Sequence, residues 1–374
     1  MYGTIIKNMK TFEYRLRTTK HQEQKLSNML WLTKNLYNTG LDELIAHYKK
    51  TGKHLNRFSH DKRHNKRTDP LLPAALVDTT IARLHISFAN FFRGLKKSRK
   101  VGFPRFRSIH RWTSFEFRDA SNYIEGSAFH SGKACAGNIK IVKHREMEGM
   151  FKRARIVKRP SGWYLQCICD VPAPTEKMKA GVVGLDFGLK SLVADSNGII
   201  TENDRTLRTQ LKKLRRAQRK VSRRAKGSQN RKRAVHELAR LHERIHQRRK
   251  DYLHKVSKKI TDMFGTIFLE DLQISNMIKN HHLALSISDA SWGMLRQFLS
   301  YKAEYAGGQV VAVAPHYTSQ RCSNCNEMVE KSLSVRTHLC PSCGYCDDRD
   351  VNAAKNILRL GLSLYSPSVC TSSA

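Results

Sequence analysis

The chain has 374 residues, and its 68 Lys and Arg against 31 Asp and Glu give a formal net charge of +37. Hydrophobic residues make up 40%, which is enough to build a core and argues against a disordered chain. No run approaches the ~18 apolar residues of a membrane span, and residues 1–17 lack the apolar stretch of a secretion signal. Because such an excess of positive charge repels itself, we expect a polyanion as partner, nucleic acid above all.

The first half of the chain is predicted to combine a helical bundle with short strands. Apolar residues recur at helical spacing from Leu26 to Ile45 and from Leu76 to Leu95. Phe88 and Phe92 are expected to pack inside this bundle, with Leu95, rather than to stack on a ligand.

Between residues 101 and 171 the apolar spacing changes to two, which predicts strands. In residues 162–171 the alternation puts Cys167 and Cys169 on one face of a sheet, so we interpret them as core residues. Cys135 and Cys370 have no partner at metal-ligand spacing, and no role is assigned to either.

A Pro-rich polar stretch at 171–175 is expected to be a linker. After it the predicted order is strand, hairpin, helix, strand, helix, strand, helix, which is typical of a ribonuclease-H-like α/β domain. Two long basic helices are expected at about 204–226 and 230–264, broken at Gly227–Ser228. A cysteine-rich loop precedes the last helix, from about Asp348 to Leu360.

Carboxylates stand where several of these elements end or begin. Asp186 and Glu270 each end a predicted strand, and Asp347, Asp348 and Asp350 cluster at the start of the last helix. In open α/β sheets ligands bind at the carboxyl ends of the strands, where gathered carboxylates repel one another unless cations hold them. Two Mg²⁺ or Mn²⁺ ions would do so, and would stabilise the attacking and leaving oxygens at a phosphodiester.

Each carboxylate also has a simpler interpretation. An Asp after a strand is usually a turn residue, and an Asp before a helix is usually an N-cap. We prefer the cap for Asp348, and Asp347 can share that role. Glu270 is harder to explain in this way, because an apolar strand end is an unfavourable place for a charge.

Five of the nine cysteines crowd into one short segment. Two C-x₂-C pairs separated by fourteen residues are the pattern of a closed tetrahedral zinc site, which is structural because it leaves no open coordination position. Cys346 and His338 are second choices as ligands. Thiols clustered in this way also indicate a reduced intracellular protein. The predicted zinc ligands are Cys322, Cys325, Cys340 and Cys343.

Residues 208–260 hold 21 Lys and Arg against three acids, a local charge of +18 in a seventh of the length. Solvated helix faces normally mix both signs, so we interpret this tract as a contact with a nucleic-acid backbone. Such contacts provide affinity and orientation rather than base specificity. The residues predicted to make the contact are Arg215, Arg216, Arg219, Lys220, Arg223 and Arg224.

Segments along nearly the whole chain resemble the transposon-encoded TnpB family, compact relatives of the type V CRISPR effector nucleases. In chain order they are MKTFEYRLRTTKHQEQKL, GFPRFRSIHRWTSFEF, GWYLQCICDV, GLDFGLKSLVADSNG, IFLEDLQISNM, TSQRCSNCN and CPSCGYCDDRDVNAAKNI. DRDxNAAxNI after paired C-x₂-C motifs is highly specific to the family. One departure is Asn326, where the family usually has Gly, so we expect a less regular zinc knuckle there.

The resemblance implies a RuvC-like nuclease domain whose three carboxylates are Asp186, Glu270 and Asp350, with Mg²⁺ or Mn²⁺ as the catalytic ion and Zn²⁺ at the cysteines. It also implies a guide RNA that pairs with one strand of a double-stranded DNA target. The N-terminal half would read a short flanking motif while the protein grips the heteroduplex through its backbone. A protein of this kind works in the prokaryotic cytoplasm or nucleoid.

The expected architecture is multidomain α+β. A helical bundle with a small β-barrel-like domain precedes a ribonuclease-H-like (RuvC) α/β domain that carries an inserted zinc ribbon. Two other functions stay open: a nuclease-inactive RNA-guided repressor, which has no need of intact carboxylates, and a transposase that acts on element ends. The expected domains are a recognition region at 1–175, the first part of the nuclease domain at 176–317, the zinc ribbon at 318–347, the last nuclease helix at 348–362 and a flexible tail at 363–374.

Overall fold

The chain splits into two compact units, Met1–Pro172 and Ala173–Ala374. Most of the predicted linker and tail, together with Cys370, lies outside the described residues. No helix in the described part of the chain is both long and apolar enough to cross a membrane. The computed structural model describes residues 8–65, 72–97, 101–118, 123–132, 135–172, 179–277, 279–280, 283–315, 317–332 and 335–364.

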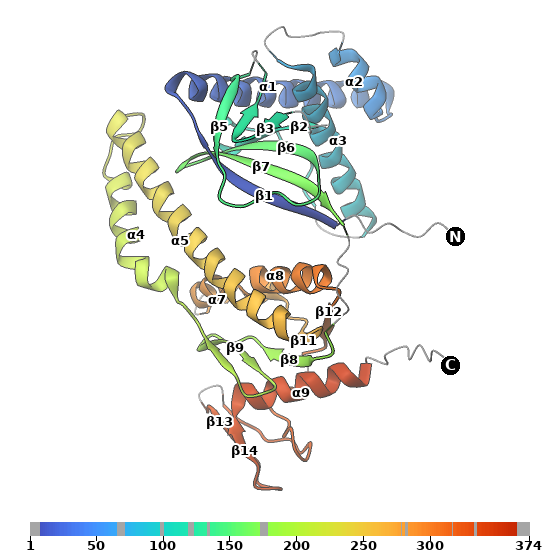
Figure 1. The fold of residues 1–374 in the computed structure, drawn as a ribbon, viewed down its shortest axis with the longest axis vertical. Helices are drawn as coiled ribbons and strands as arrows, with labels where there is room; N and C mark the ends of the chain where they lie inside the picture. The colour runs from blue at the N-terminus through green and yellow to red at the C-terminus, as the bar shows by residue number, and fades with distance from the viewer. Residues whose placement is uncertain are drawn as a thin grey trace. The chain divides into compact units, whose positions relative to one another are not determined.

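The first unit packs helices against a curled sheet of seven strands (Figure 1). The strands follow the order β2-β6-β7-β1-β5-β4-β3, and every pair is antiparallel. The elements of this unit are β1 (Asn8–Arg17), α1 (Lys20–Thr51), α2 (Arg57–Asn65), α3 (Ala74–Lys96), the 3-10 turn η1 (Ile109–Arg111), β2 (Ser114–Arg118), β3 (Ile124–Glu125), β4 (Ala128–His130), β5 (Asn138–Val142), β6 (Met150–Arg159) and β7 (Gly162–Val171).

The core of the first unit confirms most of the predicted packing. α1 and α3 are the two helices that apolar spacing predicts, and Cys167 and Cys169 of β7 are buried in the core. The predicted burial of Phe92 and Leu95 is wrong, because their side chains are 43% and 50% exposed. Both lie in the last two turns of α3, where the apolar stripe runs past Phe88, the last residue of this helix in the core cluster.

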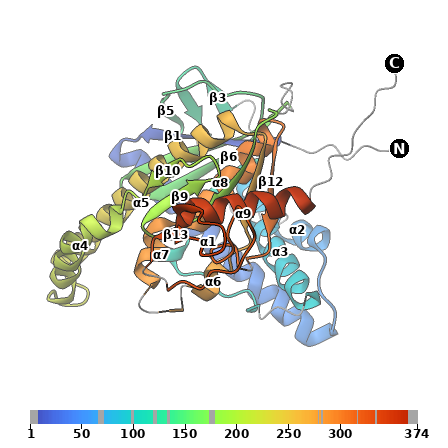
Figure 2. The same ribbon diagram turned by 90° about the horizontal axis from the view of Figure 1, so that it is seen from below.

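The second unit is a five-stranded sheet with helices on both faces (Figures 1 and 2). The strand order is β10-β9-β8-β11-β12; β8 pairs antiparallel with β9 and parallel with β11, which pairs parallel with β12. The predicted element order is confirmed, with four short elements added. The elements are β8 (Val182–Asp186), β9 (Ser191–Asp195), β10 (Ile200–Glu202), α4 (Thr206–Ser222), α5 (Gln229–Met263), β11 (Thr266–Glu270), α6 (Ile274–Met277), α7 (Ala284–Ala290), α8 (Trp292–Tyr305), β12 (Gln309–Val313), β13 (Thr337–Leu339), β14 (Cys346–Asp348) and α9 (Arg349–Leu364).

Alternation along β11 gives each face of this sheet its own core. Ile267 and Leu269 belong to the cluster that includes α5 and α8, whereas Phe268 packs with Ile357 of α9. The strand is therefore covered on both faces, as its continuous apolar sequence predicts.

Helix α9 lies directly on β8 and β11. A Cβ added to Gly184 of β8 would lie 2.2 Å from the Ala354 carbonyl oxygen, and one added to Gly361 of α9 would lie 2.1 Å from the Phe268 ring. Because only glycine permits this approach, the two positions hold the helix against the strands and bring its first turn to their carboxyl ends.

Candidate functional site

Asp186 and Glu270 lie at the carboxyl ends of adjacent parallel strands. β8 and β11 pair in register up to Leu185 and Leu269, so the two carboxylates that follow stand side by side. Asp350 lies in the first turn of α9, and its negative charge acts on Asp186 together with that of Glu270. The structure therefore places the three predicted carboxylates near the carboxyl ends of β8 and β11.

Burial and the two neighbouring acids perturb the pKa of Asp186. Burial, followed by the negative charges of Glu270 and Asp350, raises the pKa of Asp186 to about 8, although its surface keeps some contact with solvent. Burial also raises the pKa of Glu270, against the effect of a hydrogen bond from Thr318. Carboxylates that disfavour their own charged forms in this way are typical of functional sites and of sites that take up cations.

Two hydroxyl groups and an arginine hold these acids in place. Ser191 Oγ of β9 donates a hydrogen bond of 3.0 Å to Asp350 Oδ2, and Thr318 Oγ1 donates to Glu270 Oε1. Arg336 Nη1 lies 3.6 Å from Asp350 Oδ1. None of the three was predicted, because Ser, Thr and Arg at these positions carry no motif of their own.

The two other acids before α9 have different partners. Asp348 caps the helix as predicted, because its Oδ1 accepts hydrogen bonds from the backbone N–H groups of Asp350 at 2.8 Å and Val351 at 3.4 Å. The shared cap suggested for Asp347 is wrong, because its Oδ1 accepts at 2.8 Å from the backbone N–H of Asp348, which precedes the helix, and among the described residues from no N–H group of α9 itself. Asp347 Oδ2 accepts from Lys355 Nζ at 2.7 Å and from the Tyr345 hydroxyl at 2.6 Å.

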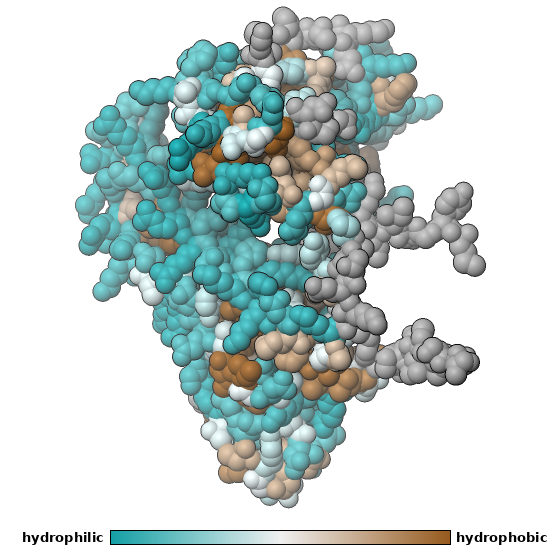
Figure 3. Space-filling model, in the orientation of Figure 1, coloured by the Kyte–Doolittle hydropathy of each residue, from teal (hydrophilic) through white to brown (hydrophobic). Residues whose placement is uncertain are grey.

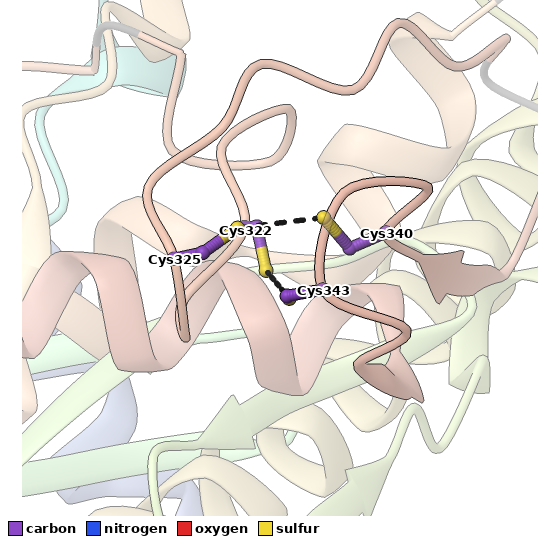
Figure 4. Close-up of side chains that lie close together, drawn as sticks. All are labelled: Cys322, Cys325, Cys340 and Cys343. Carbon is purple, nitrogen blue, oxygen red and sulfur yellow. Dashed lines mark hydrogen bonds between the residues drawn. The ribbon is translucent and has the colours of Figure 1, made fainter.

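The four predicted cysteines converge on one point beside α9 (Figure 4). Their sulfur atoms all lie within 4.8 Å of one another, so the set can hold a zinc ion. Neither second choice belongs to this cluster: Cys346 is exposed on β14, and the buried His338 ring accepts a hydrogen bond from Lys331. The four residues that could together hold such an ion are Cys322, Cys325, Cys340 and Cys343.

The two cysteine knuckles have the same backbone geometry. Asn326 follows the first pair at φ 70° and Gly344 follows the second at φ 68°. Each donates its N–H to the first cysteine of its pair, over 2.9 Å to Cys322 O and 3.0 Å to Cys340 O. The expected irregularity at Asn326 is therefore wrong, because asparagine is one of the few residues that tolerate the left-handed region.

Asparagines of α9 tie the first knuckle to the acids. Asn352 Oδ1 accepts from Ser323 N at 2.9 Å, and its Nδ2 donates to Arg321 O at 2.8 Å. Asn356 Nδ2 donates to Thr318 O at 2.8 Å and to Arg321 O at 2.7 Å. One helix thus carries a carboxylate and fixes the backbone of Thr318, whose hydroxyl contacts Glu270.

The predicted basic residues are exposed along α4 and just after its end, where the surface is largely hydrophilic (Figure 3). Lys220 pairs with Glu237 of α5 at 2.6 Å, and among the described side chains none of the other five forms an ion pair. Asp289 of α7 anchors the start of α4, since its carboxylate accepts from the N–H groups of Leu207 at 2.8 Å and Arg208 at 3.0 Å.

The fold resembles that of compact Cas12f1 proteins. A cryo-EM structure of a Cas12f1–sgRNA–target DNA complex matches with a TM-score of 0.60 at 16% identity, over 90% of this chain and 82% of that one. Residues 292–357 match the family "Cas12f1-like, TNB domain", and residues 166–281 match the family "Probable transposase". Residues 9–53 match the family "Helix-turn-helix domain", although in this chain they form β1 and the single helix α1.

Two relatives cover most of the chain. A protein of Streptomyces pristinaespiralis named "Putative RNA-guided DNA endonuclease" is 33% identical over 95% of this chain and 90% of its own length. The similarly named InsQ of Escherichia coli (strain K12) is 32% identical over 77% of this chain and 75% of its own length. The chain belongs to the TnpB family.

Proposed function

We propose that this protein is an RNA-guided DNA endonuclease that hydrolyses phosphodiester bonds at a site built from Asp186, Glu270 and Asp350. The observation that carries the proposal is the convergence of these three carboxylates at the ends of β8 and β11 and the start of α9. The names of the relatives from Streptomyces pristinaespiralis and Escherichia coli support the same activity.

The second unit, in this proposal, is a ribonuclease-H-like domain of the RuvC type. In support, the three antiparallel strands β8, β9 and β10 lie in one sheet with β11 and β12, which run parallel to β8. The nuclease domain would occupy 176–317 and 348–362, with the cysteine segment 318–347 inserted as a zinc ribbon. The first unit would be the recognition region that reads a motif flanking the target.

Mg²⁺ or Mn²⁺ fits the chemistry of the three acids, because hard cations prefer carboxylate oxygens and would relieve the repulsion that raises the pKa of Asp186. When bound, such an ion supplies charge stabilisation for the attacking and leaving oxygens. The chain's own groups orient the acids: Ser191 donates to Asp350, and Thr318 donates to Glu270. Arg336 adds a positive charge beside Asp350.

Zinc at the four cysteines would act structurally in this account, since four thiolates leave no open coordination position. Asn352 and Asn356 join the first knuckle to α9. Loss of the ion would therefore loosen Thr318 and the start of α9, the elements that position Glu270 and Asp350.

Guide RNA and target DNA would be held through their phosphates by the exposed arginines of α4. The anchoring of α4 by Asp289 gives this surface a fixed place within the second unit. Sequence specificity would come from base pairing between the guide and the target DNA. The basic protein surface would then need to contact only the phosphate backbone, which carries no sequence information. A protein that acts on such a substrate would work in the prokaryotic cytoplasm or nucleoid.

To test the proposal, the protein would be purified with its co-expressed RNA and offered plasmids that carry a target beside a randomised flanking sequence, with Mg²⁺. We expect cleavage of a subset of plasmids, no cleavage by Asp186→Ala, and DNA binding by both proteins. Asp348→Asn is the matched control, because asparagine is an equally good N-cap and should leave cleavage intact. Binding without cleavage by the wild-type protein would overturn the nuclease and favour an RNA-guided repressor.

A further inference from the structure

Helix α2 is attached to the first unit in an unusual way. Its one large apolar side chain, Phe58, is 70% exposed. Of the α2 side chains that the structure describes, the buried ones are two histidines, His60 and His64. They are four residues apart and so lie on the same face of the helix. A helix normally docks through apolar residues, so burying this pair requires another favourable interaction.

A carboxylate from α1 completes a compact triangle with the two imidazoles. Glu43 Oε2 lies 3.4 Å from His60 Nε2 and 3.1 Å from His64 Nε2, and the two Nε2 atoms are 3.2 Å apart. Zinc bonds to nitrogen and oxygen are about 2.0–2.1 Å long, and a tetrahedron with such bonds has edges of about 3.3–3.4 Å. The three ligand atoms therefore have the mutual spacing of one face of a tetrahedral zinc site.

Hydrogen bonding accounts for only part of this triangle. Each Nε2 atom of His60 and His64 carries at most one proton, and the Glu43 carboxylate oxygen accepts but does not donate when ionised. At most two of the three short contacts can therefore be hydrogen bonds. A single cation at the centre satisfies all three atoms at once.

A neighbouring histidine holds the His60 ring in position. Its other ring nitrogen, Nδ1, lies 2.9 Å from His85 Nε2 of α3, and donation of the Nδ1 proton to His85 leaves His60 Nε2 unprotonated, as a metal ligand must be. On the α1 side, a Cβ added to Gly40 would lie 3.3 Å from His60 Cε1. The helix thus leaves room for the ring beside Glu43.

We propose that Glu43, His60 and His64 bind a divalent transition-metal ion, with zinc the best match, and that this ion fastens α2 to α1. Two imidazoles and a carboxylate favour zinc over Mg²⁺ or Ca²⁺, which take oxygen ligands. Glu43 is the most exposed ligand, at 21%, and the fourth coordination position is left for water. The site is separate from the cysteine cluster and lies in the other compact unit.

The test compares zinc bound to the full-length protein with zinc bound to a His60→Asn/His64→Asn variant, after growth with zinc and removal of loose metal by gel filtration. We expect the variant to hold one equivalent less than wild type by elemental analysis. This difference does not depend on whether the cysteines are loaded. His242→Asn/His246→Asn is the matched control, because this pair has the same spacing in α5 but is exposed, and it should lose no zinc. Equal zinc in the wild type and the His60/His64 variant overturns the proposal.

A second measurement on the wild-type protein covers the case in which the variant does not fold. Zinc-edge X-ray absorption should require nitrogen or oxygen ligands at about 2.0–2.1 Å in addition to any sulfur at about 2.3 Å. A first shell of sulfur alone overturns the proposal.

Discussion

Asp186→Asn should stabilise the magnesium-free protein even though it removes a residue of the proposed active site. Burial and the charges of Glu270 and Asp350 raise the pKa of Asp186 from 3.8 to about 8. The folded protein therefore keeps this proton until about pH 8, whereas the unfolded chain releases it near pH 4. The stability that the protonated Asp186 carboxyl contributes is fully present below about pH 4, the pKa of this group in the unfolded chain. It is lost as the pH rises towards 8. Asparagine has no proton to lose and avoids this penalty.

The size of the effect follows from the same shift. Each pKa unit corresponds to about 1.4 kcal/mol, so the shift from 3.8 to about 8 corresponds to about 6 kcal/mol, of which about 4–5 kcal/mol of stability is lost by neutral pH. Because the Asp186 side chain keeps some solvent contact, we expect about 2–4 kcal/mol, or a rise in Tm of about 5–15 °C for a unit of this size.

Thermal unfolding followed by circular dichroism would measure this difference in magnesium-free buffer. At about pH 7.5 the Asp186→Asn variant should be the more stable protein, and at about pH 4 the two should be nearly equal. Asp348→Asn, which keeps its capping role, should show no such pH-dependent gain. If Asp186→Asn is no more stable than wild type at the higher pH, the proposed crowding of charge around this carboxyl is refuted.

Three further changes test other parts of the account. Cys340→Ser should lose one equivalent of zinc and make the cysteine segment more sensitive to protease; unchanged zinc would contradict the predicted ligand set. Replacing Arg215 and Arg216 with Gln should reduce the slope of log binding constant against log salt concentration by about 2, as measured by fluorescence anisotropy, and should leave Tm unchanged. An unchanged slope would show that these residues do not contact the nucleic acid. Thr318→Val should raise the pKa of Glu270 and shift the pH profile of cleavage upwards, because the hydrogen bond to this carboxyl is lost; an unshifted profile would argue against Thr318 as a positioning residue.

The sequence predicts the elements of this chain best where apolar spacing reflects burial. The helix α1, the helix α3 as far as Phe88, the alternating strand β7 and the buried strand β11 have an apolar pattern that matches their packing. α2 was missed because the pattern is absent there: the buried face is made of His60 and His64. The H-x₃-H spacing was the available signal, but its partner Glu43 comes from another helix.

The candidate site was predictable only in part, because some of its contacts join distant segments and leave no local sequence pattern. Asp186 and Glu270 could be found because strand ends meet at one edge of a sheet, and the resemblance to the TnpB family preferred Asp350 over its neighbours. The sequence alone could not decide whether Asp350 or Asp347 is the third carboxylate of the site. The difference lies in a side-chain contact, because Lys355 binds the Asp347 carboxylate and not that of Asp350. Thr318 is held beside Glu270 by long-range bonds from Asn356, which no local pattern reveals.

In the proposed function, a bound RNA selects the DNA that these carboxylates cut. The most direct measurement is to sequence the RNA that copurifies with the protein, exchange its guide segment, and map cleavage on two plasmids, one matching each guide, with the same flanking sequence. We expect cutting to move to the plasmid that matches the new guide. Cleavage that stays at the old site, or that proceeds equally well without RNA, would contradict it.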